Sequence, residues 1–262
     1  MNDNYDIEAF ERGEYRYYKR VRIPKGNGRY RLIYLVNYPF KIVLKELIPE
    51  LETILLERDN TCVNYAFEKG KNCVEGALQH VGYKYTLSMD LTDFFDSVKE
   101  SHVVDILDKH IVNTCFIDGA PRQGLPTSPL IATIAFFKCD KLIVDQIDKY
   151  NIDCVYTRYA DDLTFSFNKK SDRGKIQFIV TQAVESCGFI INNNKTKFQN
   201  YKNGRRIITG VGVNNVGVYP TRKTVKRIRA AAHQNNTPQF NGLLEWSKCK
   251  LPKPTKRALL KG

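Results

Sequence analysis

Alternating apolar and polar side chains predict a strand in the middle of the chain, beginning directly at two acidic residues. Over residues 163–167 every second side chain is apolar, which is the period-2 pattern of a half-buried strand. Residues 154–159 form a second β-rich run just before the acids. The two runs predict a hairpin with Asp161 and Asp162 at its turn. Because successive strand residues point to opposite faces, both carboxylates reach one site only if the backbone bends between them.

The same alternation over residues 85–90 predicts a strand that ends at Asp90. The remaining pattern predicts a basic hairpin over residues 16–36, helices over 39–56, 99–112, 128–149 and 171–187, and a strand over 189–194. Helices and strands are interleaved in a way that favours an α+β fold over a doubly wound one.

Aspartates also favour turns and helix N-termini for local reasons, so none of these three carboxylates is by itself a sign of chemistry. For Asp161 and Asp162 the alternative is a solvated turn, and for Asp90 it is a helix cap. If the strands are neighbours, however, the three carboxylates together match the oxygen ligands of a site for two divalent cations.

The composition predicts a globular protein with a polyanionic partner. With 262 residues, 42% of them hydrophobic, the chain is long enough for one large core or for two to three small subdomains. Its 41 Lys and Arg outnumber its 28 Asp and Glu, and the formal charge of +13 favours binding to nucleic acid or to an anionic membrane surface. Beyond Val216 a single acid, Glu245, accompanies these basic residues: Arg222, Lys223, Lys226, Arg227, Arg229, Lys248, Lys250, Lys253, Lys256, Arg257 and Lys261.

Neither a membrane segment nor an export signal is visible in the sequence. No apolar run approaches the roughly 20 residues of a membrane-spanning helix, and the N-terminal residues are acidic, so we expect a cytoplasmic protein. The seven cysteines form no C-x-x-C pair and are odd in number, which predicts reduced, mostly buried thiols. The four histidines are scattered, so any bound metal should be a hard ion with oxygen ligands.

The carboxylates belong to an ordered series of short motifs. The series comprises Asp90 with Phe95, then Gln123-Gly124-Leu125-Pro126-Thr127-Ser128-Pro129, then Tyr159-Ala160-Asp161-Asp162, and finally Gly188 followed by Lys195-Thr196. In order and spacing these motifs resemble the palm of reverse transcriptases. Upstream, residues 23–33 resemble the fingers hairpin of that family and residues 65–72 resemble its aromatic-x-x-G-basic loop. Each motif alone is weak, but the ordered set covers most of the chain and is specific.

Within that family the chain most resembles bacterial reverse transcriptases of the retron or defence-associated, group II intron-like branch. Ala77-Leu78-Gln79-His80 is similar to the retron N-A-x-x-H signature, although Gly76 stands where the asparagine would be. Ile208-Thr209-Gly210 is similar to the V-T-G of the same branch.

The resemblance implies a right-hand polymerase fold made of fingers, palm and thumb. The implied boundaries are fingers over residues 1–85, a palm over 86–215 with a fingers insertion near 99–122, and a short basic thumb over 216–262. About 50 residues follow the V-T-G-like site, so the thumb is either minimal or completed by RNA or another chain.

The resemblance also implies a role for individual residues. The metal ions would be held by Asp90, Leu91, Asp161 and Asp162, with Asp162 in a supporting role. The dNTP would contact Lys25, Arg31, Phe95, Gln123 and Gly124, and the Phe95 ring would exclude a ribose 2′-hydroxyl. Lys195 would protonate the leaving pyrophosphate. Template and primer would contact Tyr159, Arg222, Lys226 and Arg229. For the basic residues the alternative is a solvated surface, and for Phe95 it is core packing.

The implied activity is RNA-directed DNA synthesis with two Mg²⁺ ions, for which Mn²⁺ is a substitute. The enzyme would extend a primer or an RNA-linked 3′- or 2′-hydroxyl with dNTPs. Its partners would be a structured non-coding RNA, the DNA product and an effector or toxin protein, in anti-phage defence. Two alternatives stay open: a catalytically weak palm that only binds RNA, and a polymerase whose synthesis is untemplated or primed by a protein.

Overall fold

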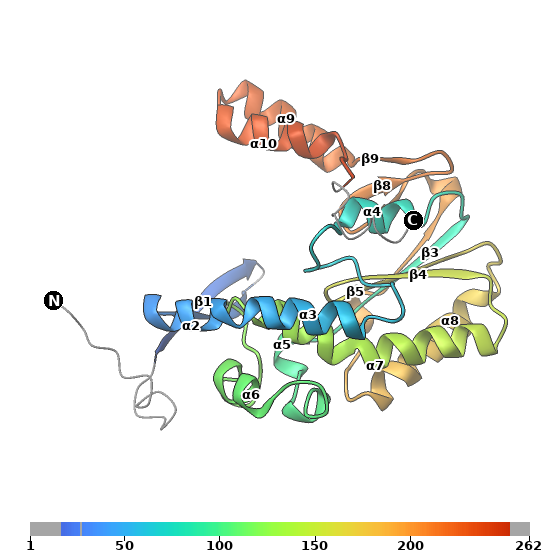
Figure 1. Cartoon of the computed structure of the whole chain (residues 1–262). Coiled ribbons are helices and arrows are strands. Elements are labelled where there is room, and N and C mark those ends of the chain that lie inside the picture. Colours follow the sequence, from blue (N-terminus) through green and yellow to red (C-terminus); the bar gives the residue numbers. More distant parts are fainter. Residues whose placement is uncertain (1–16, 27, 252–262) are drawn as a thin grey trace. The chain divides into compact units, whose positions relative to one another are not determined.

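The computed structural model describes residues 17–26 and 28–251. The chain divides into two compact units. The first comprises Met1–Asn60 and Asp93–Lys138, and the second comprises Thr61–Thr92 and Cys139–Gly262. Each unit is treated separately below, and Figure 1 shows the elements of both.

The first unit begins with the predicted basic hairpin. Strands β1 (Tyr18–Gly26) and β2 (Arg29–Val36) pair antiparallel, with a register irregularity between Pro24 and Gly26. The prediction of a single helix over residues 39–56 is wrong in one respect. The segment is helical but forms two helices, α2 (Tyr38–Glu46) and α3 (Ile48–Arg58). The break falls just before Pro49, in the first turn of α3, where a residue without an N–H is tolerated.

The second half of this unit corrects the helix predicted over residues 99–112. The chain forms α5 (Phe94–Ser97) and a 3-10 turn, η1 (Glu100–His102), and the α-helix α6 (Lys109–Cys115) begins only after Asp108. Lys99 N donates to His102 Nδ1 at 3.0 Å, a local hydrogen bond that closes the 3-10 turn. Such side-chain bonds to the backbone compete with helix formation. The helix predicted over 128–149 is confirmed as α7 (Ser128–Lys149), of which Ser128–Lys138 belongs to this unit and the remainder, from Cys139, to the second unit.

The second unit is built around a four-stranded antiparallel sheet in the order β4-β5-β3-β6. Its strands are β3 (Tyr85–Asp90), β4 (Cys154–Tyr159), β5 (Asp162–Phe167) and β6 (Lys197–Asn200). The predicted hairpin and the strand ending at Asp90 are confirmed. The strand predicted over residues 189–194 is wrong: only Ile191 forms a bridge, to Leu91, and a 3-10 turn, η2 (Asn193–Lys195), follows. Asparagine disfavours strands and favours turns, which explains the shift.

The sheet has one apolar and one polar face. Cross-strand pairing of β3 with β5 places on the apolar face Leu87 opposite Phe165 and Met89 opposite Leu163, all buried. Helices α7 and α8 (Asp172–Ser186) lie on this side of the sheet (Figure 1). On the polar face the pairs are Thr86 with Ser166, Ser88 with Thr164, and Asp90 with Asp162.

A buried ion pair ties the apolar face to α7. Arg158 on β4 donates from Nη2 to Asp140 Oδ2 at 2.6 Å and from Nε at 2.9 Å, and both side chains are fully buried. Tyr156 Oη also donates to Asp140, at 2.7 Å. Since an unpaired buried charge costs several kcal/mol, roughly 3–5 when one partner is removed, this pair fixes where β4 crosses the helix.

The far half of the polar face is sealed by a second buried network. His80 Nδ1 lies 2.9 Å from Ser166 Oγ and its Nε2 lies 2.7 Å from Thr157 Oγ1. Arg206 donates to Thr86 Oγ1 at 2.9 Å and to the His80 carbonyl at 2.7 Å. Both side chains are buried, and burial lowers the pKa of His80 to about 3 with a smaller contribution from the Arg206 charge. His80 is therefore a neutral imidazole that bridges β4 and β5.

Above this network a small second sheet packs against a short helix. The sheet comprises β7 (Arg206–Ile208), β8 (Val211–Val213) and β9 (Val218–Pro220), and the helix is α4 (Cys73–Leu78). Cys73, Val74 and Ala77 form one buried cluster with Ile208, Val211 and Val213. The two short motifs that resemble retron signatures, some 130 residues apart in the sequence, thus meet in one core. The chain continues into the helical hairpin of α9 (Arg222–His233) and α10 (Thr237–Ser247).

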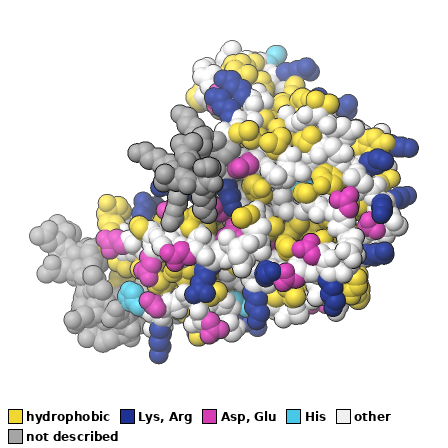
Figure 2. All heavy atoms as spheres, turned by 45° about the vertical axis from the view of Figure 1, so that its right-hand side comes forward, with side chains coloured by type: hydrophobic (Ala, Val, Ile, Leu, Met, Phe, Trp, Pro, Cys, Tyr) yellow, Lys and Arg dark blue, Asp and Glu magenta, His cyan; other side chains and the backbone are white. Residues whose placement is uncertain are grey.

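All seven cysteines are free thiols, as predicted, but only Cys73, Cys115 and Cys139 are buried, so the expectation that most would be buried is wrong. Within residues 17–26 and 28–251, no helix has the length and apolarity that crossing a membrane requires. On the face drawn in Figure 2, Lys and Arg side chains are spread out and interspersed with acidic ones.

We expect the His80 network to make folding sensitive to acid. The folded-state pKa of about 3 is below the unfolded value of about 6.5, so protonation of the unfolded chain withdraws stability as the pH falls through 6.5. Between pH 7 and pH 5 this amounts to about 2 kcal/mol. Urea unfolding of the wild type and of His80→Gln at both pH values measures it: the wild type should lose about 2 kcal/mol more than the variant. Equal losses would show that His80 is not held neutral.

Candidate active site

The turn between β4 and β5 explains how two adjacent acids approach one site. Tyr159 pairs with Asp162, so Ala160 and Asp161 form a two-residue loop. Ala160 has a φ of 56°, in the left-handed region that side chains other than glycine rarely adopt. This bend places Asp161 in the turn and Asp162 at the start of β5. The Leu91 N–H donates to the Asp161 carbonyl at 3.0 Å, which fastens the turn to the end of β3.

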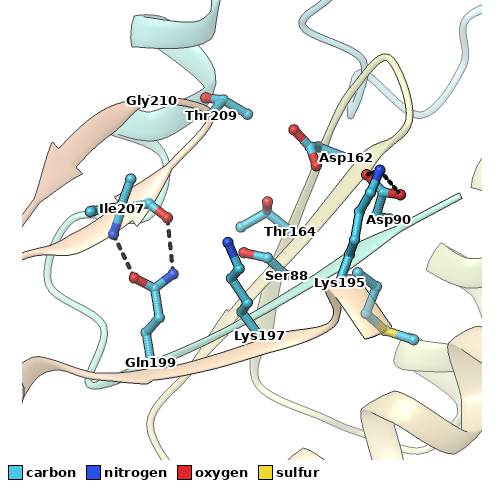
Figure 3. A pocket seen from close by; sticks show the side chains of 11 residues that line it. Ser88, Asp90, Asp162, Thr164, Lys195, Lys197, Gln199, Ile207, Thr209 and Gly210 are labelled. Carbon is cyan, nitrogen blue, oxygen red and sulfur yellow. Dashed lines mark hydrogen bonds and ion pairs between the residues drawn. The ribbon is translucent and has the colours of Figure 1, made fainter. Parts of the chain in front are cut away.

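Asp90 and Asp162 are direct partners across the two central strands. Their Cα atoms are paired in the β3–β5 register, and both side chains line one cleft (Figure 3). Like charges directly opposite one another destabilise a sheet. The pair therefore requires a cation nearby, and the structure provides one in the turn that follows Ile191.

That cation is Lys195. Its Nζ donates to Asp90 Oδ2 at 2.8 Å and to Oδ1 at 3.1 Å (Figure 3). The hydrogen bond to Asp90 raises the pKa of Lys195, and the Asp161 and Asp162 charges act in the same direction. Lys195 is thus a fully charged ammonium that neutralises Asp90.

Asp162 lacks a comparable partner among the described residues, and its environment opposes ionisation. Burial, then the Asp161 and Asp90 charges, raise its pKa from 3.8 to about 6, while Lys195 and Lys197 act in the opposite direction. A carboxyl whose pKa is strongly raised by burial and by neighbouring carboxylates is typical of functional sites. This end of the sheet stores electrostatic repulsion that a bound cation would relieve.

The cleft continues away from the carboxylates along the polar face. Its volume is about 300 Å³. Beyond Asp90, Asp162 and Lys195 it is lined by Ser88, Met89, Thr164, Lys197, Gln199, Ile207, Thr209 and Gly210. Gln199 closes the far wall by accepting from Ile207 N at 2.7 Å and donating to Ile207 O at 2.9 Å (Figure 3).

The donor set fits a divalent ion that arrives with a substrate. Within the described part of the chain no group of three or more His, Cys, Asp or Glu side chains is arranged to hold a metal. Mg²⁺, however, is typically held by one or two carboxylates together with water and substrate phosphates. Asp90 and Asp162, with Asp161 in the adjoining turn, supply that number of hard oxygen ligands and the uncompensated charge.

The five residues expected to contact the dNTP all belong to the first unit. Lys25 and Arg31 are exposed on the β1–β2 hairpin. Gln123 accepts a hydrogen bond from Tyr34 N at its carbonyl, at 2.8 Å. Gly124 has a φ of 113°, and a Cβ built there would lie 2.3 Å from the Tyr34 carbonyl oxygen, so this position excludes any side chain. The close contact with β2 therefore explains why glycine is needed at this position, whether or not the residue also contacts a dNTP.

The two adjacent phenylalanines of α5 differ in burial. Phe94 is in the core and packs edge-on against Phe136, with ring centroids 5.7 Å apart. Phe95 is only half-buried. Phe94 is therefore the packing residue, which leaves Phe95 available for another role.

The residues expected to contact nucleic acid lie on two elements of the second unit. Tyr159 is half-buried and packs against the cluster around α4. Arg222, Lys226 and Arg229 are all exposed on α9, whose buried residues are Thr224 and Ala231. The basic residues at 253, 256, 257 and 261 lie outside the described residues.

Sequence reasoning missed the inner part of the cleft, namely Ser88, Thr164, Lys197 and Gln199. A signal was present, because Lys195 and Lys197 flank a single threonine and polar residues alternate through 86, 88 and 90. Their relevance depends on the β3–β6 pairing of Ser88 with Lys197, which the sequence does not reveal.

Comparison with known proteins gives a family match over most of the chain. The reverse transcriptase (RNA-dependent DNA polymerase) family matches residues 23–226. The retron Mx65 reverse transcriptase of Myxococcus xanthus is 27% identical over 92% of this chain and 63% of its own length. The retron Ec86 and Ec83 reverse transcriptases of Escherichia coli are 28% and 30% identical, over 59% and 69% of their own lengths. The chain thus spans about three fifths of the first two relatives.

Solved structures with little sequence identity share the fold. Apo telomerase from Candida tropicalis aligns over 77% of this chain and 47% of its own, with a TM-score of 0.58 and 13% identity. A foamy viral protease-reverse transcriptase in complex with double-stranded DNA aligns over 96% of this chain and 44% of its own, with a TM-score of 0.50 and 17% identity. The α+β right-hand polymerase fold predicted from the sequence is confirmed, whereas the boundaries of fingers, palm and thumb stay a prediction.

The charge repulsion at the cleft leads to a stability prediction. Because the folded-state pKa of Asp162 is raised from 3.8 to about 6, wild-type stability should fall as the pH rises through this interval. At pH 8 without divalent ions, the free energy of unfolding of Asp162→Asn should exceed that of the wild type by about 1–2 kcal/mol. Screening by solvent keeps this difference below the roughly 3 kcal/mol that a shift of two pKa units represents.

Urea unfolding in a chelator at pH 4 and pH 8 measures the difference. The gain should be much smaller at pH 4, where the carboxyl is protonated in the folded state and roughly half protonated in the unfolded chain. Asp148→Asn, an exposed carboxylate at the end of α7, is the matched control and should change stability by less than about 0.5 kcal/mol. A destabilised Asp162→Asn variant at pH 8 would contradict the repulsion.

Proposed function

Because this chain belongs to the reverse transcriptase family and groups with the bacterial retron enzymes, we propose that it is an RNA-directed DNA polymerase that extends a hydroxyl-terminated primer with dNTPs. The observation that carries the proposal is the pairing of Asp90 with Asp162 at the open end of the polar face, with Asp161 in the adjoining turn.

We further propose that Asp90, Asp161 and Asp162, together with the main chain at Leu91, hold Mg²⁺. The bound ions would activate the primer hydroxyl and hold the leaving pyrophosphate. The chain's own contribution is to fix the carboxylates at one end of the sheet. The antiparallel register sets the Asp90–Asp162 separation, and the strained turn at Ala160 aims Asp161 toward the same end of the sheet.

Lys195 is proposed to act as the proton donor to pyrophosphate. In the structure its ammonium is engaged by Asp90, so it is charged and positioned at the site before any substrate arrives. Asp90 would hold either Lys195 or a metal ion, so Lys195 would leave this carboxylate when the site is loaded. The lysine would then be released next to the phosphates, where a cationic acid can donate its proton.

The remaining assignments follow the same proposal. Lys25 and Arg31 would neutralise the triphosphate from the basic hairpin, and Gln123 and Gly124 would lie beneath the templating pair. Tyr159 and the exposed face of α9 with Arg222, Lys226 and Arg229 would contact template and primer. The fingers, palm and thumb would correspond to residues 1–85, 86–215 and 216–262, with the fingers insertion near 99–122.

The proposed template comes from the resemblance to retron-type enzymes, with which the named relatives agree. We propose that the template is a structured non-coding RNA and that the protein acts in the cytoplasm. A function in anti-phage defence and an effector protein as partner remain expectations from the resemblance. Sequencing the RNA and DNA that co-purify with the protein tests the proposed template, because one structured RNA and DNA copied from it are expected.

Loss of a metal-binding carboxylate should abolish synthesis without unfolding the protein. Asp90→Asn and Asp161→Asn keep the side-chain volume but remove the charge that holds the ion. We expect primer extension on an RNA template with Mg²⁺ to fall by more than about a hundredfold, or at least 2.7 kcal/mol in barrier height. The surface variant Asp148→Asn should keep wild-type activity. Retention of activity within tenfold in either variant would exclude the metal assignment. Absence of extension by the wild type, with RNA binding intact, would favour an RNA-binding palm without chemistry.

The two phenylalanines of α5 provide a matched test of sugar selection. If the Phe95 ring meets a ribose 2′-hydroxyl, Phe95→Val should raise kcat/KM for rGTP relative to dGTP, whereas Phe94→Leu should leave this ratio unchanged and lower the melting temperature, because Phe94 packs in the core. Ratios of kcat/KM and thermal unfolding of both variants check this. The reverse outcome, with selectivity unchanged and stability lost in Phe95→Val, would assign Phe95 to the core.

A further inference from the structure

Two lysines line the cleft, but only one of them is engaged by a carboxylate. Lys195 is paired with Asp90, as described above. Lys197 lies two residues further on, at the first position of β6, and is exposed. Among the described residues it has neither an ion pair nor a hydrogen bond through its ammonium. In Figure 3 its side chain rises into the hollow between Ile207 and Thr164.

The floor beside Lys197 consists of two hydroxyl groups. Ser88 pairs with Thr164 on one side and with Lys197 on the other, so the three side chains form one row across β5, β3 and β6. Neither hydroxyl has a hydrogen-bond partner in the part of the chain that the structure describes. The row lies one step along the strands from the Asp90–Asp162 pair, or about 6.7 Å for two strand residues.

We propose that Lys197, Ser88 and Thr164 form a binding subsite for a phosphodiester of the DNA strand being extended, at the linkage behind its 3′-terminal nucleotide. This inference rests on the proposed function. If the terminal hydroxyl is held at the carboxylates, the next linkage of the same strand lies about one residue row away. Lys197 supplies a charged donor there, and the hydroxyls supply neutral ones.

The chemistry of the row favours a singly charged phosphodiester over a triphosphate. One ammonium and two hydroxyls match one negative charge with two free oxygens, and lysine serves as a point charge for phosphate. Gln199 is already committed to Ile207, so the far wall offers the apolar Ile207 side chain, against which a sugar can pack. The triphosphate would instead lie at the carboxylate end, where the metal ions neutralise it.

A thermodynamic cycle that combines protein variants with modified primers tests the subsite, with binding affinity as the only readout. The protein is titrated with a fluorescent DNA primer annealed to an RNA template, without dNTPs. Lys197→Gln should weaken binding about tenfold, equivalent to about 1.4 kcal/mol. The log–log salt dependence should flatten by about 0.7–0.9 for the one lost phosphate contact. Lys197→Arg should keep most of the affinity. Lys175→Gln, an exposed lysine on α8 at the opposite face of the sheet, should bind as the wild type does.

Neutral methylphosphonate linkages identify which phosphate is bound. Placed behind the 3′-terminal nucleotide of the primer, the linkage should weaken wild-type binding about tenfold and leave Lys197→Gln unaffected, because the contact is already absent. Placed at the facing position of the template, it should affect both proteins equally. Ser88→Ala should reduce the primer-linkage effect, since it removes one donor from the same oxygen.

Two results would overturn the inference. Additive effects of Lys197→Gln and the primer methylphosphonate would make Lys197 a solvated residue of an edge strand. Coupling to the template linkage instead would assign the subsite to the other strand. The cycle is measured without dNTPs, so it decides the subsite independently of catalysis. Absence of primer extension by the wild type counts only against the proposed polymerase function.

Discussion

The antiparallel register of β3 against β5 is the constraint on which the site depends, because it alone decides which residues share a face. With Asp90 opposite Asp162, every second pair along the strands is polar and every intervening pair is apolar. A slip of one residue would move the apolar set to the open face and bury the carboxylates. Burial of Leu87, Met89, Leu163 and Phe165 against the α7 and α8 side therefore holds the acids in the cleft.

The polar face is used in two different ways along its length. At one end His80 and Arg206 cover it and satisfy its hydroxyls, so that the sheet continues into the cluster around α4. At the other end no comparable network covers the described side chains, and the hydroxyls and carboxylates there line the cleft. The two ends differ because of charge. At the covered end the buried Arg206 guanidinium can hydrogen-bond to neutral hydroxyls beside a neutral imidazole, whereas the carboxylates at the cleft end need cations to balance their charge.

The cleft end carries local costs that the rest of the unit offsets. Ala160 holds a left-handed backbone conformation, and Asp162 ionises against two neighbouring carboxylates. Both features persist because the surrounding elements are firmly tied, with Arg158 and Asp140 joining β4 to α7. Strain and repulsion of this kind concentrate where a substrate or ion is expected to relieve them. The Lys195 ammonium supplies part of that relief in the absence of a ligand.

The sequence by itself determined the strands that alternate strictly, the long helix α7, the acids at the turn and the family, because these depend on periods and spacings within short segments. It misjudged residues 99–112 and 189–194, where local hydrogen bonds and asparagines replaced regular structure. Only the tertiary structure decided that Lys195 pairs with Asp90 while Lys197 does not, that Gly124 is needed against Tyr34, and that His80 meets Arg206. Each is a contact between distant segments, set by strand register and helix packing rather than by composition.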